Sequence, residues 1–215
     1  MTQPLTIAID GTFSSGKGTL SRRIASHYGI ACLDTGKLYR AVARDVLAAG
    51  GSVDDADYAA EVASRIDAAT LSDPALKSGG MGAAASKVSV HPPVRAALLA
   101  FQRDFAAKGA VLDGRDIGTV ICPDADAKLF VDADPEVRAQ RRYQELLGYG
   151  EDVTLAGVLS DLRERDHRDM NRAVAPLRPA VDAHLLDTTD LSIDSAVRTA
   201  ITMIDAVLNA KAQER

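Results

Sequence analysis

The chain has 215 residues, of which 47% are hydrophobic and 26% are charged, and its formal net charge is −5. This profile is typical of one globular domain, and the negative balance argues against binding to a nucleic-acid polymer. No apolar run approaches the roughly 18 residues that span a bilayer. The N-terminal stretch shows no export signal, and Cys32 and Cys122 are interpreted as reduced thiols, so we expect a cytoplasmic, monomeric protein without membrane contact.

The first part of the chain alternates between strand and helix signals. Residues 5–10, LTIAID, form a short apolar run with β-branched side chains, which indicates a buried strand. Apolar residues then recur at every fourth position over 20–28 and predict a helix. A second strand is expected at 31–35 and a second helix at 36–49. This order favours a parallel sheet with helical crossovers.

The rest of the chain continues the pattern with two exceptions. Strands are expected at 110–114, 127–132 and 184–189, and helices at 135–147 and 193–208. Residues 54–108 are expected to be mostly helical, with a break at 72–82. Residues 148–180 are polar and rich in arginine, with helical spacing of their leucines. We interpret both regions as excursions from a single domain that spans 1–215.

Residues 9–23, IDGTFSSGKGTLSRR, place a glycine-rich loop between the first strand and the first helix. Gly11, Gly16 and Lys17 match the first part of the P-loop pattern. In that pattern backbone N–H groups and a helix N-terminus surround phosphate oxygens, and the lysine reaches the β- and γ-phosphates. The hydroxyl comes one residue later than is common, at Thr19. We therefore predict a nucleotide site formed by Gly11, Thr12, Phe13, Ser14, Ser15, Gly16, Lys17, Gly18 and Thr19.

Arginine is concentrated near the C-terminal end of the chain. Between Asp132 and Arg178 every basic residue except His167 is an arginine. These are Arg138, Arg141, Arg142, Arg163, Arg165, Arg168, Arg172 and Arg178. A salt-bridged, solvated helix pair would explain them, but the exclusion of lysine favours bidentate contacts to phosphate. Arg40 and Arg115 follow the second and third strand candidates, where ligands of such sheets bind.

This set of residues suits phosphoryl transfer, in which a protein mainly positions the groups and neutralises charge. A phosphate acceptor needs no general base, because its second pKa is about 6. Asp113 ends an apolar strand and is a candidate to hold Mg²⁺ through water; otherwise it caps the turn. Asp10 is assigned to loop geometry, and Phe13 either packs near the nucleotide or is exposed. The four histidines lack metal-ligand spacing and are interpreted as structural or exposed.

Several segments together resemble the bacterial cytidylate kinase family, whose members are nucleoside monophosphate kinases. They are IAIDGTFSSGKGTLSRR, LDTGKLYRAVA, ASKV with PPVRAALL, LDGRDIGTVICPDADAKLFVDA, and RERDHRDMNRAVAPL, which span almost the whole chain in order. The resemblance implies a P-loop α/β fold with a five-stranded parallel sheet, helices on both faces, an acceptor-binding insertion and an Arg-rich helical lid. It also implies transfer of the ATP γ-phosphoryl group to CMP or dCMP, with Mg²⁺.

The resemblance also assigns roles to single residues. It implies that the acceptor phosphate is bound by Thr35, Arg40 and Arg115. The cytosine base would be recognised by Ser86, Arg95 and Asp116. The sugar and phosphates would be contacted by Arg165, Asp169 and Arg172. The catalytic residues expected from it are Lys17, Arg115, Arg165 and Arg172. It places the acceptor-binding region at about 36–108 and the lid at about 148–175.

The chain departs from the family pattern in places. Thr12 stands where proline is usual, Ser14 where glycine is usual, and Lys37 where a small or apolar residue is usual. The insertion at about 66–86 is short against many members, in which a small antiparallel sheet is expected. These departures bear on the closing motion more than on the chemistry.

The residues alone leave other functions open. The nearest alternative is a kinase of another small acceptor, such as UMP, AMP or a metabolite hydroxyl, and the last of these would need a base near Asp113 or Asp116. A nucleotide-switched binding protein is an alternative of another class, but several acceptor-side arginines argue against it. The ranking of CMP against dCMP, and which of Arg138, Arg141 and Arg142 reaches ATP, also stay open.

Overall fold

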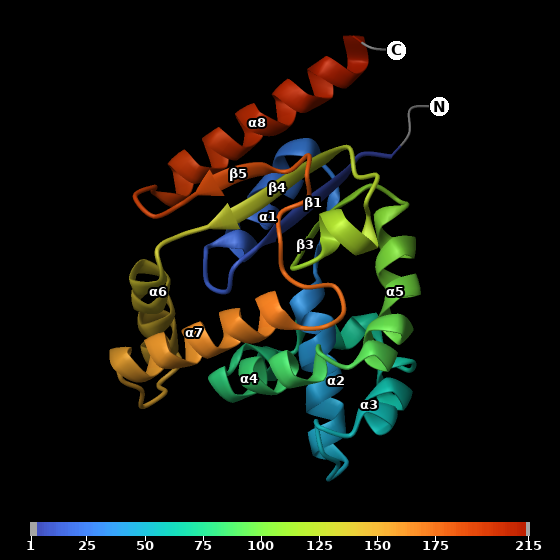
Figure 1. The fold of residues 1–215 in the computed structure, drawn as a ribbon, viewed down its shortest axis with the longest axis vertical. Coiled ribbons are helices and arrows are strands. Elements are labelled where there is room, and N and C mark those ends of the chain that lie inside the picture. The colour runs from blue at the N-terminus through green and yellow to red at the C-terminus, as the bar shows by residue number, and fades with distance from the viewer. Residues whose placement is uncertain (1–3, 214–215) are drawn as a thin grey trace.

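Strand β1 (Thr6–Gly11) forms the centre of the structure because its apolar side chains are covered on both faces of a sheet. Ile7, Ala8 and Ile9 have no exposed surface. In the computed structural model, which describes residues 4–213, the strand order is β2-β3-β1-β4-β5 and all pairs are parallel (Figure 1). The other strands are β2 (Ala31–Asp34), β3 (Ala110–Gly114), β4 (Ala127–Asp132) and β5 (His184–Asp187). The predicted five-stranded parallel α/β fold is confirmed.

Helices cover both faces of this sheet. On one face α1 (Lys17–Tyr28) and α8 (Ile193–Gln213) pack against alternate strand residues, among them Ile7 and Ile9. On the other face α2 (Thr35–Ala48) and α5 (Pro92–Ala106) bury Ala8 and its neighbours. Side chains of successive strand residues point to opposite faces, so β1 contributes to both cores.

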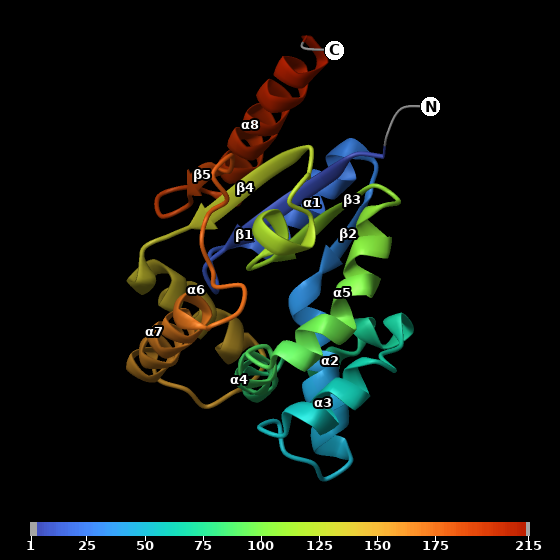
Figure 2. The same cartoon turned by 45° about the vertical axis from the view of Figure 1, so that its right-hand side comes forward.

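The remaining helices lie beyond the sheet. They are α3 (Ala56–Ala63), α4 (Gly79–Val88), α6 (Pro135–Gly148) and α7 (Leu155–Asn171), with short helical turns η1 (Ala68–Ser72), η2 (Pro74–Lys77) and η3 (Ile117–Ile121). Figure 2 shows α6, α7 and α4 beyond the carboxyl ends of β1 and β4, with α4 beside α7. A smaller apolar cluster, built on Ala139, Leu146, Val158 and Leu162, joins α6 to α7.

The predicted helix break at 72–82 is wrong in its second half. Helix α4 begins at Gly79, although Gly80 and Gly82 have little helix propensity. Its first turn is stabilised because the Ser78 hydroxyl accepts a hydrogen bond from the Met81 N–H at 3.3 Å. The described residues between β2 and β3 form helices and turns and contain no strand, so the small antiparallel sheet found in many relatives is absent there.

Other differences from the expected boundaries are small. The second strand ends at Asp34, and Thr35 already belongs to α2. In the Arg-rich region, Thr154 caps α7, and the chain after Asn171 has no regular structure before β5. Within residues 4–213, no helix combines the length and the hydropathy that a membrane-crossing segment requires.

Candidate active site

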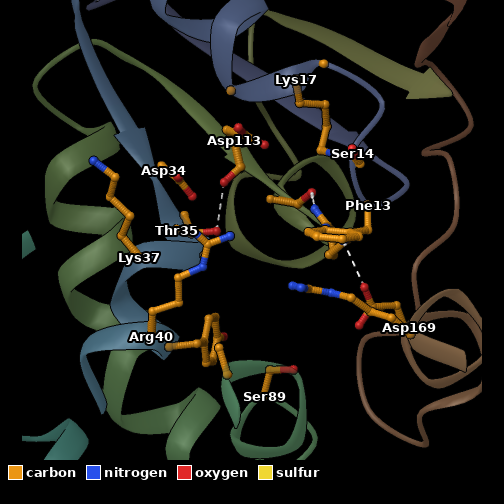
Figure 3. Close-up of a pocket in the computed structure, with 18 of the residues that line it drawn as sticks. Phe13, Ser14, Lys17, Asp34, Thr35, Lys37, Arg40, Ser89, Asp113 and Asp169 are labelled. Carbon is orange, nitrogen blue, oxygen red and sulfur yellow. Dashed lines mark hydrogen bonds and ion pairs between the residues drawn. The ribbon is translucent and has the colours of Figure 1, made fainter. Parts of the chain in front are cut away.

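A cavity of about 670 Å³ lies at the carboxyl ends of β1, β2 and β3 (Figure 3). Most of the predicted site residues line it. They are Phe13, Ser14, Gly16, Lys17, Gly18, Thr19, Thr35, Arg40, Arg95, Asp113, Arg115, Asp116, Arg165, Asp169 and Arg172. The structure therefore brings the glycine-rich loop and arginines from four separate parts of the chain into one space.

The loop after β1 has the backbone that its glycines permit. Gly11 has a φ of 147°, and a Cβ built on it would lie 1.9 Å from the Val131 carbonyl oxygen of β4. Gly16 has a φ of 91° and ends the loop where α1 begins. Ser14, where relatives usually have glycine, adopts a φ of 62°, which is the left-handed region. The loop thus keeps the glycine-type conformation at Ser14 despite the side chain.

Three loop residues shape the loop without lining the cavity: Gly11, Thr12 and Ser15. The Thr12 hydroxyl donates to Asp132 Oδ1 at 2.5 Å, which ties the loop to the end of β4. The Ser15 hydroxyl donates to the Thr12 carbonyl oxygen at 3.0 Å, inside the loop. Their contribution is to hold the loop in shape.

Lys17 begins α1, and its side chain is buried in the cavity wall. Its ammonium donates to the Thr12 carbonyl oxygen and to Ser15 Oγ, the latter at 3.3 Å. Burial, together with the nearby charge of Arg115, lowers the pKa of Lys17 to about 7, although the Asp113 carboxylate opposes the shift. The lysine is therefore a desolvated group that a phosphate would hold in its charged form.

Two carboxylates stand beside this lysine. Asp34 and Asp113 are partners in the register of β2 and β3, and both line the cavity. Burial, together with the charge of Asp34, raises the pKa of Asp113 to about 6, although the ammonium of Lys17 opposes the shift. The Asp113 carbonyl oxygen accepts a hydrogen bond from Thr35 Oγ1 at 2.8 Å. No group of three or more His, Cys, Asp or Glu side chains within 4–213 is arranged to hold a metal ion directly.

Two arginines that line the cavity, Arg40 and Arg115, have N–H donors that are not all used in hydrogen bonds. Arg40, on α2, donates only weakly to the Leu76 carbonyl oxygen at 3.4 Å, and its buried Nε has no partner among the described residues. Arg115 follows β3 and pairs with Asp169 of α7, at 3.0 Å between Nε and Oδ2. Both guanidiniums therefore lie at the carboxyl edge of the sheet and line the cavity, and their contact with a phosphate stays a prediction.

Asp116 is the centre of a buried charge group. It pairs with Arg95 of α5, and its other oxygen lies 3.4 Å from Nη2 of Arg172 at the end of α7. The Arg95 guanidinium also lies 5.7 Å from the centre of the Tyr39 ring. A carboxylate has about four acceptor positions, so Asp116 keeps acceptor capacity toward the cavity after both arginine contacts.

Ser86 is the predicted base-reading residue that does not line the cavity. It is buried in α4, and its hydroxyl accepts a hydrogen bond from Arg168 Nε of α7 at 3.3 Å. Ser89, the C-terminal cap residue directly after α4, lines the cavity in its place, and its hydroxyl donates to the Ser86 carbonyl oxygen at 2.9 Å.

The remaining arginines separate into structural and cavity-lining groups. Arg138 is buried outside the cavity and pairs with Asp166 at 2.6 Å, which joins α6 to α7. Arg141 and Arg142 line the cavity. Arg163 is exposed and pairs with Glu136 at 2.7 Å, so it belongs to the solvated type that the sequence also allowed. Position relative to the cavity, rather than burial or residue type, therefore decides which arginines contribute to the site.

Several lining residues were missed by the sequence reasoning, namely Arg22, Asp34, Tyr39, Glu145 and Tyr149. Asp34 ends β2 as Asp113 ends β3, so the same rule could have found it. Lys37 also lines the cavity, and Figure 3 shows it extending away from Phe13 and Asp169. This departure from the family pattern therefore lies on the far side of the cavity from the loop tip.

A second, more apolar cavity of about 310 Å³ lies on the outer side of the loop. It is lined by Ser15, Gly16, Leu20, Arg141, Thr188, Leu191, Ile193 and Ala196. Arg141 and Gly16 line both cavities, and Arg141 is held by a 2.7 Å hydrogen bond to the Thr188 carbonyl oxygen. The loop thus has a charged cavity on one side and an apolar cavity on the other.

Groups outside the cavity have structural roles. The Asp10 carboxylate accepts hydrogen bonds from the Ile117 and Gly118 N–H groups, both at 2.8 Å. It therefore serves loop geometry as expected, but for the loop after β3. The His91 ring contacts the Val53 carbonyl oxygen at 2.9 Å and precedes α5. Both cysteines are free thiols.

Known proteins match this chain over nearly its whole length. A model of the cytidylate kinase family matches residues 7–206. A cytidylate kinase of Rhodopseudomonas palustris (strain ATCC BAA-98 / CGA009) is 58% identical over 203 residues, which cover 94% of this chain and 96% of that protein. A cytidylate kinase of Brucella suis biovar 1 (strain 1330) is 54% identical over 207 residues, which cover 95% and 94%.

Solved structures share the fold at low sequence identity. A gluconokinase from Sinorhizobium meliloti 1021 gives a TM-score of 0.55 at 14% identity and covers 100% of this chain and 99% of its own. A shikimate kinase from Bacteroides thetaiotaomicron gives a TM-score of 0.51 at 11% identity, with 94% and 98% covered. These structures support the parallel-sheet architecture alone.

Proposed function

The chain belongs to the cytidylate kinase family, and we propose that its cavity transfers the γ-phosphoryl group of ATP to CMP or dCMP. The products are ADP and CDP or dCDP. One observation carries the proposal: Lys17 on the loop and the acceptor-side guanidiniums of Arg40, Arg115 and Arg172 line the same cavity. The γ-phosphate of ATP and the phosphate of the acceptor nucleotide can therefore meet in this cavity.

ATP is bound by the loop after β1. Its phosphates lie against the backbone N–H groups from Gly11 to Thr19 and against the ammonium of Lys17, with the N-terminus of α1 adding its dipole. The apolar cavity on the outer side of the loop accommodates the purine base. Arg141 lines both cavities, which favours it over Arg138 and Arg142 as the arginine between base and phosphates.

The acceptor binds on the other side of the charged cavity. Arg40 and Arg115 hold its phosphate with Thr35, and Arg165, Asp169 and Arg172 contact its sugar and phosphates. Asp116, fixed by Arg95 and Arg172, accepts a hydrogen bond from the 4-amino group of cytosine, which uracil lacks. Ser86 does not line the cavity, so it supports base recognition indirectly, by accepting the hydrogen bond that the cavity-lining Ser89 donates to its carbonyl oxygen.

The chemical step relies on positioning and charge. The acceptor phosphate is largely ionised at pH 7, so it attacks without a general base. Charge that spreads over the equatorial oxygens during transfer is neutralised by Lys17, Arg115, Arg165 and Arg172. The walls formed by α6 and α7 keep water, the competing acceptor, away from the γ-phosphorus.

The residues present also fit Mg²⁺, because the oxygen-rich pair Asp34 and Asp113 lies beside the loop and suits a hard cation. Asp113, with Asp34 beside it, would hold the ion through water, and Thr19 of α1 lines the same cavity. When bound, the ion supplies charge neutralisation to the phosphates of ATP.

The proposal also includes the domain organisation, the oligomeric state and the location of the protein. One domain spans 1–215, residues 36–108 bind the acceptor with a short insertion at 66–86, and residues 148–175 form the lid. The protein acts on small nucleotides as a cytoplasmic monomer. The two free thiols support a reducing compartment, and the net charge of −5 argues against a nucleic-acid polymer as partner.

The proposal is tested by incubating the protein with ATP, Mg²⁺ and CMP and identifying the products by chromatography. We expect CDP and ADP in equal amounts. Lys17→Ala should lower kcat by about 100- to 1000-fold, as expected for loss of one transition-state charge contact, while the circular dichroism spectrum is unchanged. Near-normal turnover by this variant would remove Lys17 from the reaction.

A further inference from the structure

Arg165 has an unusual environment for a buried guanidinium. It belongs to α7, and its Nη1 donates to the Gly82 carbonyl oxygen of α4 at 3.2 Å. Its buried Nε has no hydrogen-bond partner in the described part of the chain. Burial and the like charges of Arg115, Arg40 and Arg142 lower the pKa of Arg165 to about 9, although the nearby Asp169 carboxylate opposes the shift. This differs from Arg115, whose Nε and Nη1 contact Asp169 and Gly114.

Besides its hydrogen bond to the Gly82 carbonyl oxygen, Arg165 contacts an aromatic ring. Its guanidinium lies 4.0 Å from the centre of the Phe13 ring, at the tip of the glycine-rich loop. Arg142 of α6 lies 5.7 Å from the same centre. The face of a phenyl ring attracts a cation through its quadrupole, and the attraction grows when the pair is shielded from water. A ring also accepts no conventional N–H···O hydrogen bond, so it fixes the guanidinium without using its donors.

Phe13 is itself fixed, which makes it suitable for this role. Its carbonyl oxygen accepts a hydrogen bond from Arg138 Nη1 at 3.1 Å, and the neighbouring Ser14 hydroxyl donates to the Arg138 carbonyl oxygen at 3.2 Å. Its ring packs against the apolar cluster that joins α6 to α7. Figure 3 shows Phe13 between the loop residue Ser14 and Asp169 of α7. The ring therefore sits at the junction of loop and helix α7.

We propose that Phe13 is a positioning residue that acts through Arg165. The ring holds the guanidinium against the loop without using its donors, so the N–H groups other than the one that Nη1 donates to Gly82 remain available to the phosphoryl group in transfer. A carboxylate in the same place would hold Arg165 more strongly but would occupy its donors and cancel its charge. The inference rests on the proposed function, because it assigns Arg165 to the transferring phosphoryl group.

The first test compares Phe13→Leu with Phe13→Tyr. Leucine keeps the apolar packing and removes the ring, whereas tyrosine keeps the ring. We expect Phe13→Leu to lower kcat for CMP phosphorylation by about 3- to 30-fold, the range of a partly desolvated cation–π contact. KM for ATP and for CMP should change less than about twofold, and Phe13→Tyr should stay within about twofold of the natural protein. Phe105→Leu, a comparable aromatic change in α5 outside the cavity, should leave kcat unchanged.

The second test asks whether the effect passes through Arg165. In an Arg165→Gln background, which removes the cation, we expect Phe13→Leu to change kcat by less than about twofold. The Hε proton of Arg165, identified by its loss in Arg165→Gln, should show an upfield ring-current shift in the natural protein and in Phe13→Tyr, and lose it in Phe13→Leu. This spectrum needs no substrate, so it is independent of which monophosphate is the acceptor.

The proposal is overturned if Phe13→Leu keeps the natural kcat, if it lowers kcat equally with and without the Arg165 cation, or if the Hε shift does not depend on the ring. If another monophosphate proves to be the acceptor, the same kinetic comparison is made with that acceptor. The turnover of the natural protein with CMP tests the proposed function, whereas the comparison of the variants with the natural protein tests the role of Phe13, so the two failures are distinguishable.

Discussion

The backbone of Gly11 lies so close to β4 that a Cβ on Gly11 would be 1.9 Å from the carbonyl oxygen of Val131. This approach aligns the start of the phosphate-binding loop, because the next residue, Thr12, donates its N–H to that same oxygen at 3.2 Å. The Val131 carbonyl oxygen therefore lies against Gly11 of β1 and also accepts the first hydrogen bond of the loop. A side chain at Gly11 would push the backbone of β1 away from this oxygen.

We predict that Gly11→Ala destabilises the protein by at least about 3 kcal/mol, because backbone atoms must move to admit the methyl group. Gly16→Ala is a matched control in the same loop. Its Cβ would meet nothing within 4 Å, so only the strain of its φ of 91° remains, at about 1–2 kcal/mol. Urea unfolding of both variants measures the difference. Equal losses of unfolding free energy would contradict this account of Gly11.

Asp10 gives a prediction for pH dependence. Burial raises its pKa from 3.8 to about 6, although the Ile117 and Gly118 N–H groups oppose the shift. Between these two values the folded protein holds a proton that the unfolded chain has released, so the contribution of Asp10 to stability is lost as pH rises through about 6. Asp10→Asn does not titrate, and it serves as the reference.

The unfolding free energy of the natural protein minus that of Asp10→Asn should therefore fall between pH 4 and pH 7 by up to about 3 kcal/mol. Urea titrations of both proteins at several pH values provide the measurement. A difference that is flat or that increases over this range would show that the folded-state pKa of Asp10 is not raised.

Arg40 gives a prediction about the acceptor phosphate. Its unpartnered Nε and its fork geometry suit a bidentate contact that a lysine cannot make. We expect Arg40→Lys to raise KM for CMP about tenfold and to leave KM for ATP within about twofold. Arg44→Lys is the control, one turn further along α2, because Arg44 pairs with Asp73 at 2.9 Å and does not line the cavity. Equal kinetic effects of the two variants would remove Arg40 from the site.

Asp116 is expected to determine which pyrimidine is accepted. Its carboxylate attracts the 4-amino group of cytosine and repels the carbonyl oxygen at the same position of uracil. Asp116→Asn, which keeps the shape, should lower the ratio of kcat/KM for CMP to that for UMP by at least about tenfold. Asp116→Ala should do the same, with lower stability because Arg95 and Arg172 lose their buried partner. An unchanged ratio in both variants would place base recognition elsewhere.

The strands and the loop could be predicted because their signals are local. Short β-branched runs predicted β1, β3 and β4, and the glycine spacing predicted the loop, since both depend on neighbouring residues. The start of α4 could not be predicted in the same way. Three glycines within residues 79–82 argue against a helix, and the packing of α4 against α2 and α7 outweighs their propensity.

The roles of single arginines also depend on contacts between distant residues. Arg138 and Arg141 lie on the same helix and are indistinguishable in sequence, yet one is an internal ion-pair partner and the other lines both cavities. The stacking of Arg165 on Phe13 joins two segments at opposite ends of the chain. Such contacts are formed only when the chain folds. The sequence could therefore indicate which residue types belong to the site, but not how they are arranged.

The measurement that tests the central claim most directly is ADP release from ATP and Mg²⁺ with CMP, dCMP, UMP, AMP and GMP in parallel. The account predicts high kcat/KM for CMP and dCMP and values at least about a hundredfold lower for the other three, since a buried acceptor group left unpaired discriminates strongly. Turnover led by another monophosphate would contradict the roles of Ser86, Arg95 and Asp116. Absence of turnover with all five would contradict the kinase assignment itself.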